Sequence, residues 1–140
     1  MSYLNQLDQM LDAEYRLVTI ESDDIERVLE LFSQLTRFSN KAFYFWKNNA
    51  GMHRLGASHI TLPNTQSIGD ILTHIESSKH YGVYLLDDFN DLLKNKQIVS
   101  RLKSIAEDEF EKVLILLGEN IQLPKTLKQY TLRSKHKIKN

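Results

Sequence analysis

Four short apolar runs, spaced widely along the chain, place the strongest limit on the folds open to this sequence. They are Arg16–Glu21 (RLVTIE), Ala42–Trp46 (AFYFW), Gly82–Leu86 (GVYLL) and Lys112–Leu117 (KVLILL). None of them alternates strictly between polar and apolar residues, as a strand with one face in water does. Strands that are apolar throughout are typical of a parallel sheet covered by helices on both faces. The runs therefore predict an α/β fold.

Amphipathic segments lie between these runs. Apolar residues at three- and four-residue spacing predict helices over residues 3–13, 23–38, 68–75 and roughly 95–109. We expect Ser22 and Ser67 to cap the second and third helices, because a serine hydroxyl accepts a hydrogen bond from a first-turn N–H. The alternation of strands and helices predicts a three-layer αβα sandwich of the P-loop or Rossmann-like kind, with a mostly parallel sheet of four or five strands.

Three further segments complete the expected layout. Residues 47–66 fit no regular element and are expected to form a long loop, which in a small domain is often functional. Pro124–Tyr130 is expected to form one or two helical turns, and Thr131–Arg133 a fifth, edge strand. At 140 residues the chain has room for one domain. We assign residues 1–130 to it and residues 131–140 to a basic C-terminal tail.

The charges balance overall but not along the sequence. The chain has 18 Lys and Arg against 18 Asp and Glu, so a chain-wide attraction to nucleic acid or membrane is not expected. No acidic residue follows Glu119, whereas six basic residues do: Lys125, Lys128, Arg133, Lys135, Lys137 and Lys139. An acidic body with a basic end leaves one route to an anionic partner such as nucleic acid, through the tail.

Composition narrows the class of protein. The chain has no cysteine, which excludes disulfides, thiolate metal sites and cysteine nucleophiles. Its apolar runs are far shorter than the ~20 residues of a membrane span. The first residues, MSYLNQLDQM, do not resemble a signal peptide. A cytoplasmic protein without membrane contact is expected.

Parallel sheets bind ligands beyond the carboxyl ends of their strands. The residues expected there are Glu21 and Ser22, Trp46 and Lys47, Asp87 and Asp88, and Gly118 and Glu119. We expect Trp46 to be exposed beside this crevice. The candidate residues for binding a ligand or partner are Trp46, Lys47, Arg54, Asp87, Asp88 and Glu119.

The strand end Leu85–Asp88 has one half of a nucleotide site. Carboxylates directly after a buried strand are placed to hold Mg²⁺ near phosphates, so Asp87 and Asp88 are candidate metal ligands. The other half, a G-x-x-x-x-G-K-[ST] phosphate loop, does not occur in the sequence. Gly51 and Gly56 have the right spacing but are followed by Ala57-Ser58. The simpler interpretation is that Asp87 and Asp88 are solvated acids at a strand end. On this interpretation we expect no cofactor.

Other arrangements remain as alternatives. Asp23, Asp24 and Asp87 are spaced like the acidic residues of a phosphoacceptor receiver domain. However, no hydroxyl residue ends the fourth strand and no lysine ends a clear fifth one. His53 and His59 share the long loop without a metal-ligand spacing. The aromatic run Phe43–Trp46 is expected to be mostly core.

The order of several motifs resembles a known family. These are Trp46 with Gly51 and Arg54-Leu55-Gly56, then Leu85–Phe89, Arg101-Leu102, and Leu123-Pro124 with Leu127. Together they are similar to the N-terminal domain of AAA-type ATPases known as a chloroplast and cyanobacterial reading-frame family, with bacterial relatives. The resemblance covers roughly residues 10–130.

The resemblance implies a P-loop-like fold without its phosphate loop, placed before an ATPase module that performs the hydrolysis. This chain stops near the point where that module would begin, so we do not expect an enzyme. The resemblance implies a non-catalytic binding or regulatory module that contacts a protein, either an AAA-type ATPase or a copy of itself. The alternatives are an Mg²⁺-dependent nucleotide-binding or phosphoacceptor domain using Asp87 and Asp88, and nucleic-acid binding through the tail.

Overall fold

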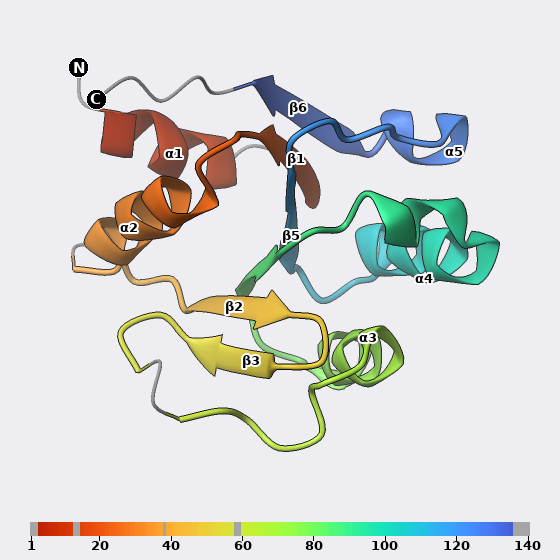
Figure 1. Cartoon of the computed structure of the whole chain (residues 1–140), viewed down its shortest axis with the longest axis horizontal. Helices are drawn as coiled ribbons and strands as arrows, with labels where there is room; N and C mark the ends of the chain where they lie inside the picture. Colours follow the sequence, from red (N-terminus) through yellow and green to blue (C-terminus); the bar gives the residue numbers. More distant parts are fainter. Residues whose placement is uncertain (1–2, 13–14, 38, 58–59, 136–140) are drawn as a thin grey trace.

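A six-stranded sheet in the order β3-β2-β4-β5-β1-β6 lies at the centre of the computed structural model (Figure 1). The structure describes residues 3–12, 15–37, 39–57 and 60–135. The strands are β1 (Leu17–Glu21), β2 (Phe43–Lys47), β3 (Gly51–Arg54), β4 (Val83–Leu86), β5 (Val113–Gly118) and β6 (Thr131–Lys135). The helices are α1 (Tyr3–Leu11), α2 (Ile25–Leu35), α3 (Ile68–Ser77), the 3₁₀ turn η1 (Asp91–Lys94), α4 (Lys96–Glu107) and α5 (Lys125–Lys128).

The four apolar runs form the parallel centre of the sheet, as predicted. β1 pairs with β5 and β6, and β4 pairs with β2 and β5, all in parallel. β4 and the first five residues of β5 are fully buried. Strands covered on both faces have no position for polar side chains, which is why these runs do not alternate.

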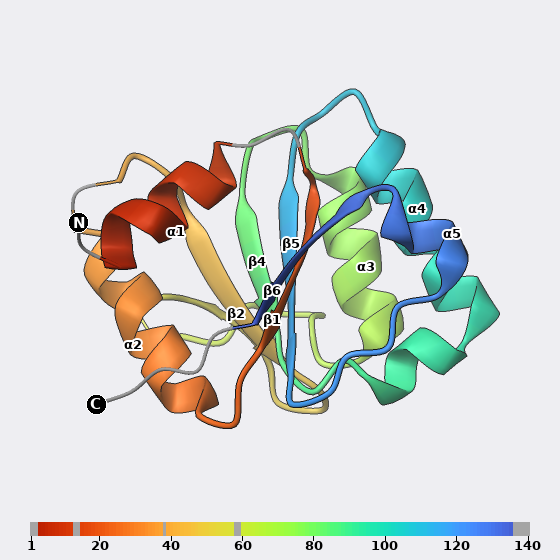
Figure 2. The same ribbon diagram turned by 90° about the horizontal axis from the view of Figure 1, so that it is seen from above.

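Helices cover both faces of the sheet, which gives the expected three layers (Figure 2). α1 and α2 lie on one face, and α3, α4 and α5 on the other. Successive residues of one strand therefore enter different cores. In β5, Leu114 and Leu116 pack with the α3–α5 side, whereas Ile115 and Leu117 pack with the α1–α2 side.

The sheet has one strand more than expected, because residues 51–54 pair with β2 in an antiparallel hairpin. The hairpin turn follows Lys47, and the N–H of Ala50 donates to the Lys47 carbonyl at 3.1 Å. Asn49 (φ 67°) and Gly51 (φ 95°) adopt the left-handed conformation that asparagine and glycine tolerate best. β3 is short and lies at the sheet edge, so it lacks the apolar signature by which the central strands were found.

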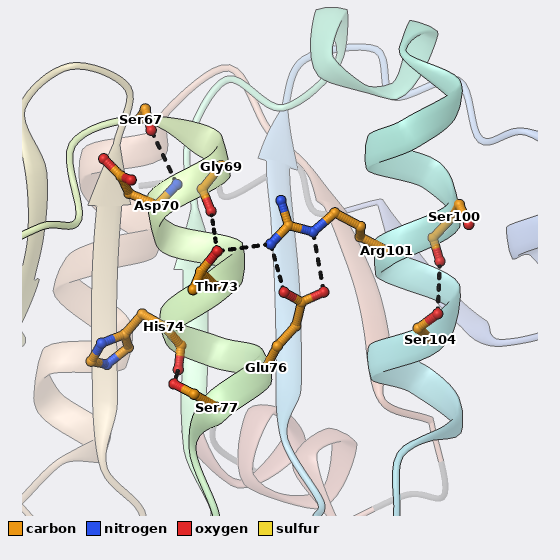
Figure 3. Close-up of polar contacts among 10 residues, drawn as sticks. All are labelled: Ser67, Gly69, Asp70, Thr73, His74, Glu76, Ser77, Ser100, Arg101 and Ser104. Carbon is orange, nitrogen blue, oxygen red and sulfur yellow. Dashed lines mark hydrogen bonds and ion pairs between the residues drawn. The ribbon is translucent and has the colours of Figure 1, made fainter.

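The start of α2 also differs from the expectation. Asp24, and not Ser22, is its N-cap, and the Asp24 carboxylate accepts a hydrogen bond from the Arg27 N–H at 3.1 Å. The Ser22 hydroxyl is buried and accepts from the Asp24 N–H at 3.0 Å, in a turn before the helix. Ser67 caps α3 as predicted, with its hydroxyl accepting from the Asp70 N–H at 3.0 Å (Figure 3).

The two neighbouring helices α3 and α4 are joined by a polar contact. Arg101 of α4 contacts the Glu76 carboxylate at 3.1 Å and 2.5 Å, and the Thr73 hydroxyl at 3.0 Å (Figure 3). Such a two-point contact fixes the direction of the arginine side chain and pairs its positive charge with a carboxylate. Arg101 is therefore held on the side of α4 that faces α3.

Residues 131–135, which the sequence placed both in a possible edge strand and in the tail, form β6. This strand pairs with β1 over five residue pairs from Leu17↔Thr131 to Glu21↔Lys135. The rest of the tail, residues 136–140, lies outside the described residues.

Candidate functional site

The carboxyl ends of four parallel strands meet at one edge of the sheet and surround an open crevice. The cavity measures about 790 Å³. Its lining comes from the residues that follow β1, β2, β4 and β5: Ser22, Asp23, Ile25, Lys47, Asn48, Asn49, Asp87, Asp88, Asn90, Gly118, Glu119 and Asn120. Four of the six candidate residues, Lys47, Asp87, Asp88 and Glu119, are thus brought together. We call this cavity the carboxyl-edge crevice.

The path of the chain explains why the crevice is open at this edge. β1 continues into α2 on one face of the sheet, whereas its neighbour β5 continues towards α5 on the other face (Figure 2). Adjacent strands whose following segments diverge in this way leave a gap above the sheet. At the base of this gap, the Ser22 N–H donates a hydrogen bond to the Gly118 carbonyl at 2.9 Å and so joins the ends of β1 and β5.

The two aspartates after β4 are positioned by backbone contacts to both neighbouring strands. The Asp87 N–H donates to the Trp46 carbonyl of β2 at 3.0 Å, and the Phe89 N–H donates to the Leu117 carbonyl of β5 at 3.2 Å. Between these bonds the chain turns sharply, and Asp88 takes a left-handed φ of 49°. Phe89 is fully buried and anchors the turn. Asp87 and Asp88 therefore sit on a tight turn that is hydrogen-bonded to both neighbouring strands.

The electrostatics of the crevice are dominated by carboxylates. Asp23, Asp87, Asp88 and Glu119 line it, against the single cation Lys47. Burial raises the pKa of the Asp87 carboxyl, and the charge of Asp88 raises it further, although a hydrogen bond to the backbone of Asp88 and the charge of Lys47 oppose the shift. The carboxyl of Asp87 is thus held where its charge is poorly solvated, a pattern that recurs at functional sites.

Amide side chains complete the lining, and the sequence analysis missed them. They are Asn48 and Asn49 after β2, Asn90 after β4 and Asn120 after β5. The Asn90 side-chain oxygen accepts a hydrogen bond from the Gln122 N–H at 3.1 Å, which ties the segment after β5 to the segment after β4. The recurrence of asparagine directly after the apolar runs was the signal available in the sequence.

The described residues of the crevice do not form the phosphate cradle of a P-loop fold. In P-loop folds the phosphates occupy the free N–H groups of a glycine-rich loop and helix N-terminus after a strand. Here the connection from β1 to α2 is Ser22-Asp23-Asp24, and the Asp24 carboxylate already accepts the Arg27 N–H. Four of the twelve lining residues are acidic and one is basic, so the net charge of the lining disfavours a phosphate group.

Metal binding receives no support beyond the Asp87–Asp88 pair itself. Within the described part of the chain, no group of three or more His, Asp or Glu side chains is placed to hold an ion. The ring of His53 packs edge-on against Phe45 at 5.7 Å, and burial lowers the pKa of its imidazole. His59 lies outside the described residues. Of the receiver-like acids, Asp24 is committed to the helix cap and only Asp23 joins Asp87 at the crevice.

Two candidate residues lie away from the crevice. Trp46 is fully buried, contrary to the expectation, because the segment before α3 crosses over it and its indole N–H donates to the Thr65 carbonyl at 2.7 Å. Arg54 is exposed but lies at the far end of the hairpin, since β3 runs antiparallel and pairs Arg54 with Tyr44 while Gly51 pairs with Lys47. Neither side chain contributes to the cavity lining.

Comparisons with known proteins agree with this architecture. The chain is similar to a DNA polymerase III gamma subunit-related protein from Thermotoga maritima, with a TM-score of 0.58 and 16% sequence identity. The match covers 99% of this chain and 47% of that protein, so the chain spans about half of its length. At this identity the likeness shows the fold alone. No curated protein matches the sequence.

None of the described helices combines the length and apolar content needed to cross a membrane. The family model for the N-terminal domain of SpoVK-like AAA ATPases matches residues 3–136, nearly the whole chain. This match confirms the resemblance carried by Trp46, the Leu85–Phe89 strand end and the Leu123-Pro124 turn. The chain belongs to the family of SpoVK-like AAA ATPase N-terminal domains.

Proposed function

We propose that this chain is a non-catalytic, AAA-type binding module that acts through protein contacts at the carboxyl-edge crevice and the adjoining β2–β3 turn. The observation that carries the proposal is the cap of α2, where Asp24 takes the N–H that a phosphate would use. A second copy of the chain or an AAA-type ATPase module is the partner that the family membership favours.

The chemistry of the crevice supports a protein partner. Its carboxylates and asparagine amides accept hydrogen bonds, and its one cation, Lys47, is outnumbered. Backbone N–H groups and basic side chains of a partner loop are suited to this surface, because each meets an acceptor or an opposite charge. The turn formed by Asp87 and Asp88 is hydrogen-bonded to β2 and β5, which would limit the conformational entropy lost on binding.

The first experiment tests for nucleotide. Titration calorimetry with Mg·ATP, Mg·ADP and Mg²⁺ alone is expected to show no binding tighter than about 1 mM. Binding of Mg·ATP that Asp87→Asn removes would overturn the proposal in favour of a nucleotide-binding or phosphoacceptor domain. Asp91→Asn is the matched control, since Asp91 is an exposed acid outside the crevice.

The second experiment tests for the partner. Sedimentation velocity of the chain alone, and mixed with the ATPase module of a family member, is expected to show a complex that Asp88→Lys weakens and Asp91→Lys does not. Asp88 is exposed at the crevice, so its replacement changes the surface without disturbing the core. If the chain forms no complex, either with itself or with the ATPase module, the crevice is not the contact surface. The same conclusion follows if Asp88→Lys and Asp91→Lys both behave like the unmodified chain.

A further inference from the structure

A second cavity lies between α4 and α5, on a part of the surface separate from the carboxyl-edge crevice. It is an open groove of about 420 Å³ lined by Leu93, Lys96, Val99, Ser100, Lys103, Pro124 and Thr126. Leu93, Val99 and Pro124 form an aliphatic floor, and no aromatic or acidic side chain takes part. We call it the α4–α5 groove. Its volume falls within the ~300–1,000 Å³ of typical ligand sites.

The groove is bordered by one regular stripe of α4. Lys96, Val99, Ser100 and Lys103 follow each other at three- and four-residue spacing, so they share one face of the helix. The opposite face, with Ile98, Leu102 and Ile105, is buried against the sheet. The outward face of α4 therefore presents Val99 and Ser100 between two lysines, Lys96 and Lys103.

The lysines of this border are not neutralised by the protein. No ion pair is found for Lys96 or Lys103 anywhere in the described residues, although other lysines, such as Lys41 and Lys112, are paired. Arg101 is turned away and held by Glu76 of α3 (Figure 3). The positive charge at the groove is thus left for a ligand.

We propose that the α4–α5 groove binds an acidic amphipathic helix of a protein partner. Its apolar residues would pack on Leu93, Val99 and Pro124, and its carboxylates would meet Lys96 and Lys103. A helix laid into an apolar groove is a common mode of peptide recognition, and opposite charge at the border sets its direction and specificity. Nucleic acid fits less well, because the groove has no aromatic ring on which a base can stack.

This surface is independent of the crevice. Lys96 and Lys103 do not line the crevice, and Asp87, Asp88 and Glu119 do not line the groove. Nucleotide binding at the crevice would therefore leave the groove proposal standing, and a failure at the groove would leave the proposed function standing. Separate variants distinguish the two.

The test is a selection from a random peptide library displayed on phage, with the whole chain as bait. We expect the selected peptides to be acidic and to carry aliphatic residues at three- and four-residue spacing. Synthetic copies should bind the Lys96→Glu/Lys103→Glu variant about tenfold more weakly, with an affinity that falls as salt rises. Lys79→Glu is the matched control, since Lys79 is an exposed lysine outside the groove.

Circular dichroism establishes that each variant is folded, and Val99→Ser supplies a second test that leaves every charge in place. It is expected to weaken the selected peptides by removing part of the apolar floor. Peptides without acidic bias, or peptides that bind both lysine variants equally, would overturn the proposal. So would tight binding of a DNA or RNA oligonucleotide, or of anionic vesicles, that is lost in Lys96→Glu/Lys103→Glu while the peptides are unaffected.

Discussion

At the level of single residues, the crevice holds a carboxyl group that the fold does not stabilise in its charged form. Asp87 is half-buried after β4, and burial raises the pKa of its carboxyl. Asp108 shows the opposite case, because the ammonium group of the buried Lys112 lies 3.2 Å from its carboxylate and lowers its pKa. One acid therefore weakens the fold at neutral pH, and the other strengthens it.

Replacing Asp87 by asparagine is expected to stabilise the protein at neutral pH. The pKa of Asp87 is higher in the folded state than in the unfolded state. Its charge therefore destabilises the fold once the pH rises above the ordinary aspartate range, and this effect is absent well below that range. Asp87→Asn should raise the melting temperature at pH 7 by about 1–3 °C and change little near pH 3. Thermal unfolding followed by circular dichroism at both pH values measures the difference.

Asp108→Asn provides the comparison of opposite sign. It removes the carboxylate that accompanies Lys112, whose side chain has no exposed surface. The stability that Asp108 contributes is present at neutral pH and is lost as the pH falls through its lowered pKa. The variant should therefore melt at a lower temperature at pH 7 and approach the unmodified protein in acid. Equal shifts for the two variants would contradict the assignment of Asp87.

At the level of elements, the β2–β3 hairpin shows where the sequence was least informative. β3 is four residues long and antiparallel, and it lies in a stretch expected to be irregular. Its position is fixed by contacts distant in sequence: the Thr65 hydroxyl accepts from the Met52 N–H at 2.9 Å and donates to the Leu62 carbonyl at 2.7 Å. Apolar periodicity detects burial and not such polar ties, so the central strands were predicted and this one was not.

Gly51 is the residue on which the hairpin depends most. It has a φ of 95°, and a Cβ atom at this position would lie 2.8 Å from Cγ2 of Thr61 and 3.2 Å from Oγ1 of Thr65. Gly51→Ala is expected to lower the free energy of unfolding by about 2 kcal/mol or more, through backbone strain and crowding. Urea unfolding followed by tryptophan fluorescence measures the loss, since Trp46 lies in the paired strand.

Gly69→Ala is the control for this change. Gly69 lies in α3, and the nearest atom to an added Cβ is Oγ of Ser67 at 3.9 Å. Alanine is a better helix former than glycine, so this variant is expected to gain about 0.5 kcal/mol. A loss of similar size in both variants would mean that hairpin geometry does not set the cost at Gly51.

At the level of the whole molecule, the layers, the parallel centre of the sheet and an edge strand at Thr131 followed from the sequence, whereas β3 and the shape of the crevice did not. Four buried runs separated by amphipathic helices favour a covered parallel sheet, because strands covered on both faces are apolar along their whole length. The crevice was located from the strand ends, and Lys47, Asp87, Asp88 and Glu119 meet there. Trp46 and Arg54 were misplaced, because neither the crossing segment nor the direction of β3 is encoded locally.

The C-terminal strand gives a prediction at this scale. β6 covers the outer edge of β1, and Thr131 is buried with its hydroxyl bonded to the Leu127 carbonyl at 2.7 Å. Deleting residues 131–140 is expected to lower the melting temperature by about 10 °C or more, because five residue pairs with β1 are lost. Deleting residues 136–140 keeps every one of these pairs and should change it little.

The same pair of deletions separates stability from nucleic-acid binding. A salt-dependent affinity for DNA that disappears with residues 136–140, in a chain that melts normally, would support the basic tail as a contact. If DNA binding is lost only when residues 131–140 are deleted, the loss would instead be attributed to the absence of β6. An intact melting curve after removal of residues 131–140 would contradict the structural role of β6.

The carboxylate that closes the start of α2 also bears on how such a domain changes over evolutionary time. A functioning phosphate cradle here would require a longer connection after β1, the removal of Asp24 from its own helix and a new cation among the acids of the crevice. These changes fall on different segments around the crevice, so no single substitution supplies all of them. A gain of phosphate binding at this edge would therefore need several coordinated substitutions, and it would cost α2 its cap.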